Sequence, residues 1–229
     1  MAREFTKNML IMLISIMVGV VIITYFVADI VRRTQIETLT IEHAAEIQNI
    51  NYRNENFTDH ILQGTVKMDS AREIREVGNY YFDFALFWYT NAVSTYNNSI
   101  RVNYCNRCIT NCTEAMTNYL SSYDKFKISK PYFEKAKDYT DNDKYLELIG
   151  YYTSFAQAGI NITMLRYNAS VLLKKAAENL SLNNMENVTL LITLFNETEM
   201  LYAQQVAIYN TYKEQISEYL FFDTIREPH

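Results

Sequence analysis

The most constraining feature of this sequence is the spacing of its apolar residues between residues 145 and 220. They recur at alternating intervals of three and four positions, in two runs that Ser181-Leu-Asn-Asn184 separates. This alternation is typical of a left-handed coiled coil or a long helical bundle. We therefore expect two antiparallel helices. The positions that would form the seam between them are Tyr145, Leu148, Tyr152, Phe155, Gly159, Ile162, Arg166, Ala169, Leu173, Ala176 and Leu180, and then Met185, Val188, Ile192, Phe195, Glu199, Tyr202, Val206, Tyr209, Lys213, Ile216 and Leu220.

Two charged residues interrupt these runs at matching positions. If the turn is centred between Leu182 and Asn183, residue i lies level with residue 365 − i, which places Arg166 opposite Glu199. A charge buried in a seam is costly unless it is paired. The sequence therefore predicts a structural ion pair between Arg166 and Glu199 that fixes the register of the two helices.

The rest of the chain also favours helices. Only 5 Gly and 2 Pro occur in 229 residues, too few turn residues for a β-sandwich or an alternating α/β fold. Gly64 is a predicted helix end, and Ser70-Ala-Arg-Glu73 has the capping-box spacing of a new helix start. A further helix is predicted to begin at Ser129-Lys-Pro131. The predicted fold is all-α: an N-terminal transmembrane helix, followed by an elongated antiparallel bundle of four to five helices with coiled-coil-like packing.

A membrane anchor is predicted at the N-terminus. The 19 residues from Met9 to Val27 carry no charge, and a helix of that length crosses roughly the 30 Å hydrocarbon core of a bilayer. Phe26 occupies a position that a signal-peptide cleavage site requires to be small, which favours an uncleaved signal-anchor. The predicted organisation is a short cytoplasmic N-terminus (1–8), the anchor (9–28), a helical stalk (29–69), a helical-bundle ectodomain (70–225) and a tail (226–229).

Glycosylation motifs predict the orientation. Lysine and arginine are balanced on the two sides of the anchor, so charge alone does not decide it. The motif Asn-x-Ser/Thr occurs eight times after the anchor, whereas 22 Asn and 31 Ser and Thr in 229 residues give about three by chance. This excess predicts a glycosylated extracytoplasmic domain, unless it reflects only an Asn-rich genome. The motifs begin at Asn56, Asn97, Asn111, Asn161, Asn168, Asn179, Asn187 and Asn196.

Cys105, Cys108 and Cys112 are the only cysteines, and their spacing places them on one helical face. Three interpretations remain open. They are small buried residues of a seam, or two of them form a disulfide and leave a thiol that bridges to a second chain, or they take part in metal or redox chemistry. Metal binding would require a fourth ligand, and no His or further Cys lies nearby in the sequence.

Aromatic residues are concentrated between residues 80 and 89. Rings on every side of this helical segment exceed what one core-facing stripe can bury. The excess predicts a contact surface for a protein partner, with Tyr80, Phe87, Trp88 and Tyr89 as its candidate residues.

The expected class of function follows mainly from the catalytic motifs that the sequence lacks. The sequence contains no HExxH, no Gly-x-Ser-x-Gly and no phosphate-binding glycine loop, so we expect no enzyme, metal or cofactor. A formal net charge of −5 argues against nucleic-acid binding. We expect a single-pass membrane glycoprotein that acts as a structural or interaction component, with a protein partner or a second copy of itself. The alternative is an extracytoplasmic ligand-binding or sensor bundle that works through a partner, with its ligand left open.

Overall fold

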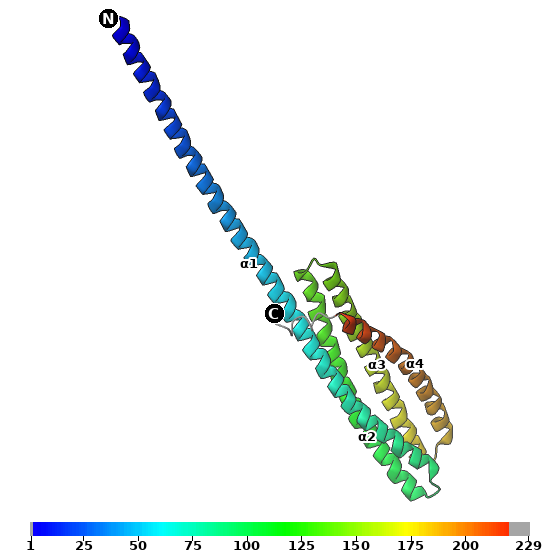
Figure 1. The fold of residues 1–229 in the computed structure, drawn as a ribbon. Coiled ribbons are helices and arrows are strands. Elements are labelled where there is room, and N and C mark those ends of the chain that lie inside the picture. The colour runs from blue at the N-terminus through cyan, green and yellow to red at the C-terminus, as the bar shows by residue number, and fades with distance from the viewer. Residues whose placement is uncertain (1, 220–229) are drawn as a thin grey trace. The chain divides into compact units, whose positions relative to one another are not determined.

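The computed structural model describes the backbone of residues 2–219 and the side chains of residues 24–219. The described chain is entirely helical and contains no strand (Figure 1), which confirms the predicted helical bundle. The elements are α1 (Ala2–Ser94), α2 (Asn98–Ala136), the 3-10 helix η1 (Lys137–Tyr139), α3 (Asp143–Ser181) and α4 (Met185–Glu218). The predicted bundle end at residue 225 and the tail 226–229 lie outside the described residues.

The chain forms two compact units, residues 1–53 and residues 54–229. The last part of the predicted stalk, from residue 54, therefore belongs to the bundle unit. Most of the predicted anchor, residues 9–23, lies outside the described side chains. From residue 24 to residue 219, no helix has a stretch that is both long enough and apolar enough to cross a membrane.

Asparagine side chains begin three of the helices. Asn97 Oδ1 accepts a hydrogen bond from Ile100 N at 3.1 Å, and Asn142 Oδ1 accepts one from Lys144 N at 3.0 Å. Asn184 caps α4 in the same way. A capping side chain satisfies an amide that has no partner inside the helix, so these residues mark where the helices start. Between α3 and α4, Asn183 adopts a left-handed conformation with φ of 58°, which Asn tolerates better than most residues.

Helices α1 and α2 are antiparallel and approach each other through small residues. A Cβ atom at Gly64 would lie 2.6 Å from Phe133 Cε1, and one at Gly78 would lie 2.7 Å from Tyr119 Cε1. In both pairs the residue numbers add up to 197, so residue i of α1 faces residue 197 − i of α2. From Ile61 to Phe82 a large residue of one helix consequently faces a small one of the other, which lets the two backbones come close. Further buried pairs in this register are Ile61 with Ala136, Met68 with Ser129, Ala71 with Phe126, Arg75 with Ser122, Phe82 with Ala115 and Tyr89 with Cys108.

Two predicted helix boundaries are wrong. Helix α1 continues through Gly64 and Ser70, because Gly64 provides space for the Phe133 ring and does not end the helix. Helix α2 continues through Pro131, which lies on the exposed side. The carbonyl that loses its helical donor there can be solvated, so the proline is tolerated. The bundle therefore contains four long helices.

The buried face of α1 is not the one that its large apolar residues indicate. Large apolar residues suggest a stripe through Val77 and Phe84, but both side chains are at least 40% exposed. The buried positions include Gly78, Ala85 and Ala92, whose small side chains carry little hydrophobic signal. Gly78 admits the Tyr119 ring, and Ala85 and Ala92 face Cys112 and Cys105 in the 197 − i register. This face is therefore defined by close packing of small residues more than by hydrophobicity.

Helices α3 and α4 are antiparallel and closely follow the predicted register of 365 − i. Arg166 faces Glu199, and the rings of Phe155 and Tyr209 stack with centroids 4.2 Å apart. Gly159 of α3 is also in close contact with α2, since a Cβ there would lie 2.5 Å from Phe126 Cε1.

A tyrosine–carboxylate cluster joins the beginning of α3 to the end of α4. Glu147 accepts hydrogen bonds from Tyr219 and from Tyr151, and these bonds hold the pKa of Glu147 below its ordinary value. A carboxyl group whose pKa is lower in the folded state stabilises that state above its unfolded pKa of about 4.3, and the contribution is lost as the pH falls through the lowered pKa.

We expect acidification from pH 7 to pH 3 to loosen the last turn of α4. The Glu147→Gln variant should already show faster amide exchange there at pH 7, because it lacks the charged acceptor. Hydrogen–deuterium exchange of residues 212–219 measures both effects. Equal exchange in the variant and the original protein at pH 7 would show that the cluster does not hold this end of α4.

Candidate functional site

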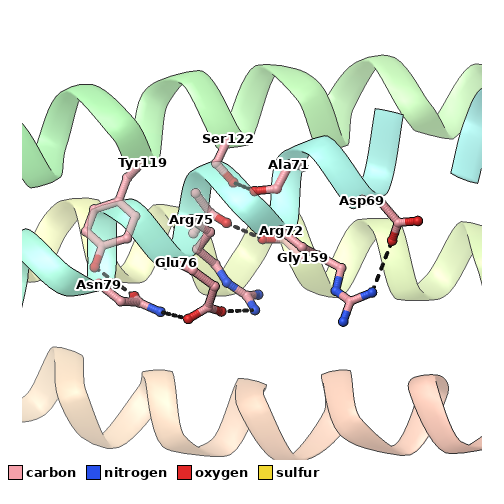
Figure 2. Close-up of polar contacts among 10 residues, drawn as sticks. Asp69, Ala71, Arg72, Arg75, Glu76, Asn79, Tyr119, Ser122 and Gly159 are labelled. Atoms are coloured by element: carbon pink, nitrogen blue, oxygen red, sulfur yellow. Dashed lines mark hydrogen bonds and ion pairs between the residues drawn. The ribbon is translucent and has the colours of Figure 1, made fainter. Parts of the chain in front are cut away.

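A polar cleft lies between α1 and α4 in the bundle unit. Its volume is about 530 Å³, within the range of small-molecule sites. Figure 2 shows Arg72 and Arg75 extending from α1 toward α4. We call this feature the α1–α4 cleft. Its lining residues are Asp69, Arg72, Glu73, Arg75, Glu76, Tyr209, Asn210 and Lys213.

Arg75 is the least satisfied group of the cleft. It is only 8% exposed, and its Nε and Nη1 atoms have no hydrogen-bond partner. Its Nη2 atom lies 3.3 Å from Glu76 Oε1, and the guanidinium lies 4.9 Å from the centre of the Tyr209 ring. A buried charge is expensive unless hydrogen bonds satisfy it. Two of the three guanidinium nitrogens are therefore shielded from solvent without a hydrogen-bond partner.

Tyr209 contributes a second buried polar group, from α4. The residue is 4% exposed, and its hydroxyl has no hydrogen-bond partner. Burial raises the pKa of Tyr209, while the positive charges of Arg75 and Arg72 and the close approach of the Arg75 guanidinium to the hydroxyl act in the opposite direction. The hydroxyl therefore stays protonated at neutral pH and can donate a hydrogen bond. The wall of the cleft thus contains buried polar groups from two helices.

The charges around the cleft are balanced. Three cationic side chains and three carboxylates line it. Arg72 Nη1 lies 3.0 Å from Asp69 Oδ1, and Asn79 Nδ2 donates to Glu76 Oε2 at 3.2 Å (Figure 2). These contacts hold one arginine and one carboxylate in place beside Arg75.

The sequence prediction misses Arg75, although the sequence contains a signal for it. Arg75 occupies a seam position of α1, between Ala71 and Gly78 in the three-four alternation of buried residues. A charged residue at such a position requires a partner. The same reasoning identifies Arg166 from the sequence. Because the large apolar residues of α1 indicate a face through Val77 and Phe84, the apolar pattern does not mark Arg75 as buried.

Arg166 and Glu199 come together as the register predicts. Arg166 Nη1 donates to both carboxylate oxygens of Glu199, at 2.7 and 2.6 Å. The guanidinium also lies 3.8 Å from the centre of the Tyr202 ring and 4.7 Å from that of Phe82. The ion pair thus connects α3 and α4, and the cation also contacts α1.

The three cysteines are free thiols in the core. Cys105, Cys108 and Cys112 are each fully buried, and the Sγ atoms of Cys108 and Cys112 lie 3.9 Å apart. The pKa of Cys105 is raised by burial, and that of Cys108 by its contact with Cys112 and by burial. A protonated buried thiol is a poor nucleophile and metal ligand. Across residues 24–219, no group of three or more His, Cys, Asp or Glu is placed to hold a metal ion.

The eight predicted glycosylation positions all lie away from the core. Five of these asparagines are exposed and three are half-buried. At the tip of α3 and α4, Asn187 Nδ2 donates to Asn179 Oδ1 at 3.3 Å, so two motifs are adjacent in space. The exposed positions are Asn97, Asn161, Asn168, Asn187 and Asn196, and the half-buried ones are Asn56, Asn111 and Asn179.

An exposed apolar surface on α1 is formed by Val77, Tyr80, Phe84 and Phe87, which we call the α1 aromatic surface. Between 40% and 59% of each residue is exposed. The Tyr80 and Phe84 rings meet edge to face with centroids 4.8 Å apart.

The structure divides the other two predicted contact residues between surface and core. Trp88 is half-buried, between Phe87 and Tyr104. Tyr89 does not belong to the surface: it is 9% exposed, and burial beside Cys108 and Cys105 raises its pKa to about 12. Adjacent residues on a helix point about 100° apart, so these two rings face different environments.

Comparisons with known proteins identify no relative: no protein-family model, curated protein or solved structure matches the chain.

Proposed function

We propose that the protein is a single-pass, membrane-anchored glycoprotein whose helical bundle faces away from the cytoplasm and contacts another protein or a second copy of itself. The uncharged segment 9–28 and the eight glycosylation motifs support the anchor and the orientation. The bundle would act as a structural or interaction component of a membrane assembly, without catalysis, metal or cofactor.

The observation that carries the interaction role is the α1 aromatic surface. Exposing several large aromatic rings on one helix is unfavourable in water, and a contiguous apolar patch on a folded protein marks a contact site. Aromatic residues also contribute strongly to protein interfaces. Val77 extends the surface along α1 from Tyr80, at the three-residue helical spacing that keeps both on one face.

We expect the triple variant Tyr80→Gln/Phe84→Gln/Phe87→Gln to lose association with its partner while keeping its fold. The substituted rings are exposed, so the midpoint of thermal unfolding should change little. Chemical cross-linking of membranes that contain the full-length protein measures the yield of higher-mass species, and circular dichroism checks the helices.

A matched control uses three exposed apolar residues that lie far apart on α2 and α4, in the variant Ile100→Gln/Leu120→Gln/Ile208→Gln. This variant should retain the cross-linked species. Equal yields from the original protein and the α1 triple variant would refute the interaction role of the α1 aromatic surface.

Ligand binding is a second candidate function, favoured by the α1–α4 cleft. The cleft has a volume of about 530 Å³ and a largely polar lining from both helices, features that are typical of small-molecule sites. An extracytoplasmic bundle with such a site would act as a sensor or carrier through a partner.

A further inference from the structure

We infer that the glycan carried by Asn168 covers an apolar groove between α3 and α4, which we call the α3–α4 groove. The inference rests on the proposed function, because a glycan must be attached, and it adds the surface of the protein to which one sugar chain binds. The groove has a volume of about 400 Å³. Its lining residues are Asn168, Val171 and Leu172 of α3 and Leu194, Glu197, Thr198 and Leu201 of α4.

The surface of the α3–α4 groove is mainly apolar and needs a cover. Leu194 is 40% exposed and Leu201 is 52% exposed, and their seven-residue spacing places them on the same side of α4. Val171 and Leu172 contribute half-buried aliphatic side chains from α3. A contiguous exposed apolar patch on a folded protein marks a place that another group covers.

Asn168 brings a glycan to this groove by covalent attachment. It is exposed, it lines the groove, and it begins the motif Asn168-Ala-Ser170. In the 365 − i register Asn168 lies level with Glu197, so its attachment point lies between Leu194 and Leu201 along the groove. A tethered group has an effective concentration on the order of millimolar, so weak contacts are enough to hold it in place.

The side-chain amide of Asn168 can carry a sugar without losing a contact of the fold. Between residues 24 and 219, no hydrogen bond engages that amide. Two other motif asparagines differ in this respect. Asn111 Nδ2 donates to the backbone carbonyl of Arg107 at 2.8 Å. Asn179 Nδ2 donates in the same way to Lys175 at 2.9 Å, so a glycan at either position would interfere with a helical contact.

The lining of the groove also fits the chemistry of a sugar. A pyranose ring has C–H surfaces that pack on aliphatic side chains and hydroxyl groups that need acceptors. The leucines offer the first kind of surface, and the exposed Glu197 carboxylate offers an acceptor. Thr198 Oγ1 donates to Leu194 O at 2.8 Å, so it too can accept from a sugar. A purely apolar occupant would bury the Glu197 charge without a partner, which is costly.

The test uses the full-length protein and its Asn168→Gln variant, both purified from the native membrane. Peptide mass spectrometry identifies the motifs that carry glycans, and hydroxyl-radical footprinting measures the oxidation of Leu194 and Leu201. We expect a glycan on Asn168, and its loss should raise the oxidation of both leucines at least about twofold, because exposed apolar surface loses its cover. Met200 is 66% exposed and is turned about 100° from Leu201, so it serves as the internal reference.

Asn196→Gln is the matched control. Asn196 begins a motif at nearly the same level of the helix pair, but it is two residues from Leu194 and therefore about 160° around α4. Its loss should leave the oxidation of both groove leucines unchanged. A glycan at Asn196 without protection of the groove would show that the effect of Asn168 depends on the side to which the sugar is attached.

Thermal unfolding tests whether the glycan acts through the groove. Asn168→Gln should lower the thermal midpoint by about 2–4 °C, the scale of uncovering part of two leucine side chains in a chain of this size. In the background Leu194→Gln/Leu201→Gln the same substitution should change the midpoint little, because the apolar contact is already lost. An equal decrease in both backgrounds would overturn the inference.

The footprinting outcomes separate this inference from the proposed function. Glycans at other motifs but none on Asn168 would refute the inference and leave the glycoprotein proposal intact. No glycan at any motif would refute both. Low leucine oxidation with and without the Asn168 glycan would show that a protein partner or a second copy covers the groove, and high oxidation in both would show that the groove is open. Either result would refute the inference.

Discussion

Replacing Gly159 with alanine is expected to destabilise the bundle by about 1–3 kcal/mol, although alanine is the better helix former. The new Cβ would lie 2.5 Å from Phe126 Cε1 and 2.7 Å from its Cζ. Phe126 is fully buried, so its ring cannot move without opening the interface between α2 and α3. The thermal midpoint of the full-length protein measures the effect, with a decrease of about 2–4 °C per kcal/mol for a chain of this size.

The same substitution at Gly150 is the matched control, in the same helix. No atom lies within 4 Å of a Cβ built at Gly150. Gly150→Ala should therefore stabilise the protein by about 0.5–1 kcal/mol, the difference in helix propensity. Adding Phe126→Leu to Gly159→Ala should recover part of the loss. Stabilisation by Gly159→Ala comparable to that by Gly150→Ala would contradict the close packing of α3 on α2.

Replacing Glu199 with leucine is expected to cost about 2 kcal/mol or more. The substitution leaves Arg166 without its counter-ion in a partly buried seam, where only 17% of its side chain is exposed. Breaking a fully buried pair typically costs about 3–5 kcal/mol, and partial exposure reduces this value. The contact between the Arg166 guanidinium and the Tyr202 ring compensates only in part, because it does not neutralise the charge.

The double variant Arg166→Met/Glu199→Leu should regain most of that stability. Two apolar residues of similar volume fill the seam without a desolvation penalty, and such replacements are often neutral or stabilising. Thermal unfolding of the original protein, the two single variants and the double variant under the same conditions gives the coupling between the two positions. A double variant as unstable as Glu199→Leu alone would show that the pair does not set the register of α3 and α4.

The sequence predicts α3 and α4 better than α1 and α2, for a physical reason. The seam of α3 and α4 is occupied mainly by large apolar residues, and Arg166 and Glu199 interrupt it at the same level, so periodicity reveals both face and register. The α1–α2 interface alternates large with small residues, and Gly64 resembles a helix end when only its own segment is considered. A small residue such as Gly64 contributes to packing through the large residue that faces it on α2. That facing residue can be identified only when the register of the two helices is known.

The same limitation explains the outcome for the candidate site. The sequence reveals Arg166 because it reveals the seam that contains it, whereas Arg75 lies on a face of α1 that the apolar pattern does not mark. Tyr209 is placed correctly in the α4 seam, yet its unsatisfied hydroxyl depends on which atoms surround it. A cleft between α1 and α4 is a property of tertiary packing that no local pattern encodes.

The most direct test of the proposed membrane glycoprotein is the intact mass of the full-length protein that remains in the membrane pellet after alkaline carbonate washing. We expect the protein to stay in the pellet with a mass well above the 26.9 kDa of the unmodified chain, because the anchor holds it there and glycans occupy several of the eight motifs. Release into the supernatant, or a mass of 26.9 kDa in the pellet, would contradict it.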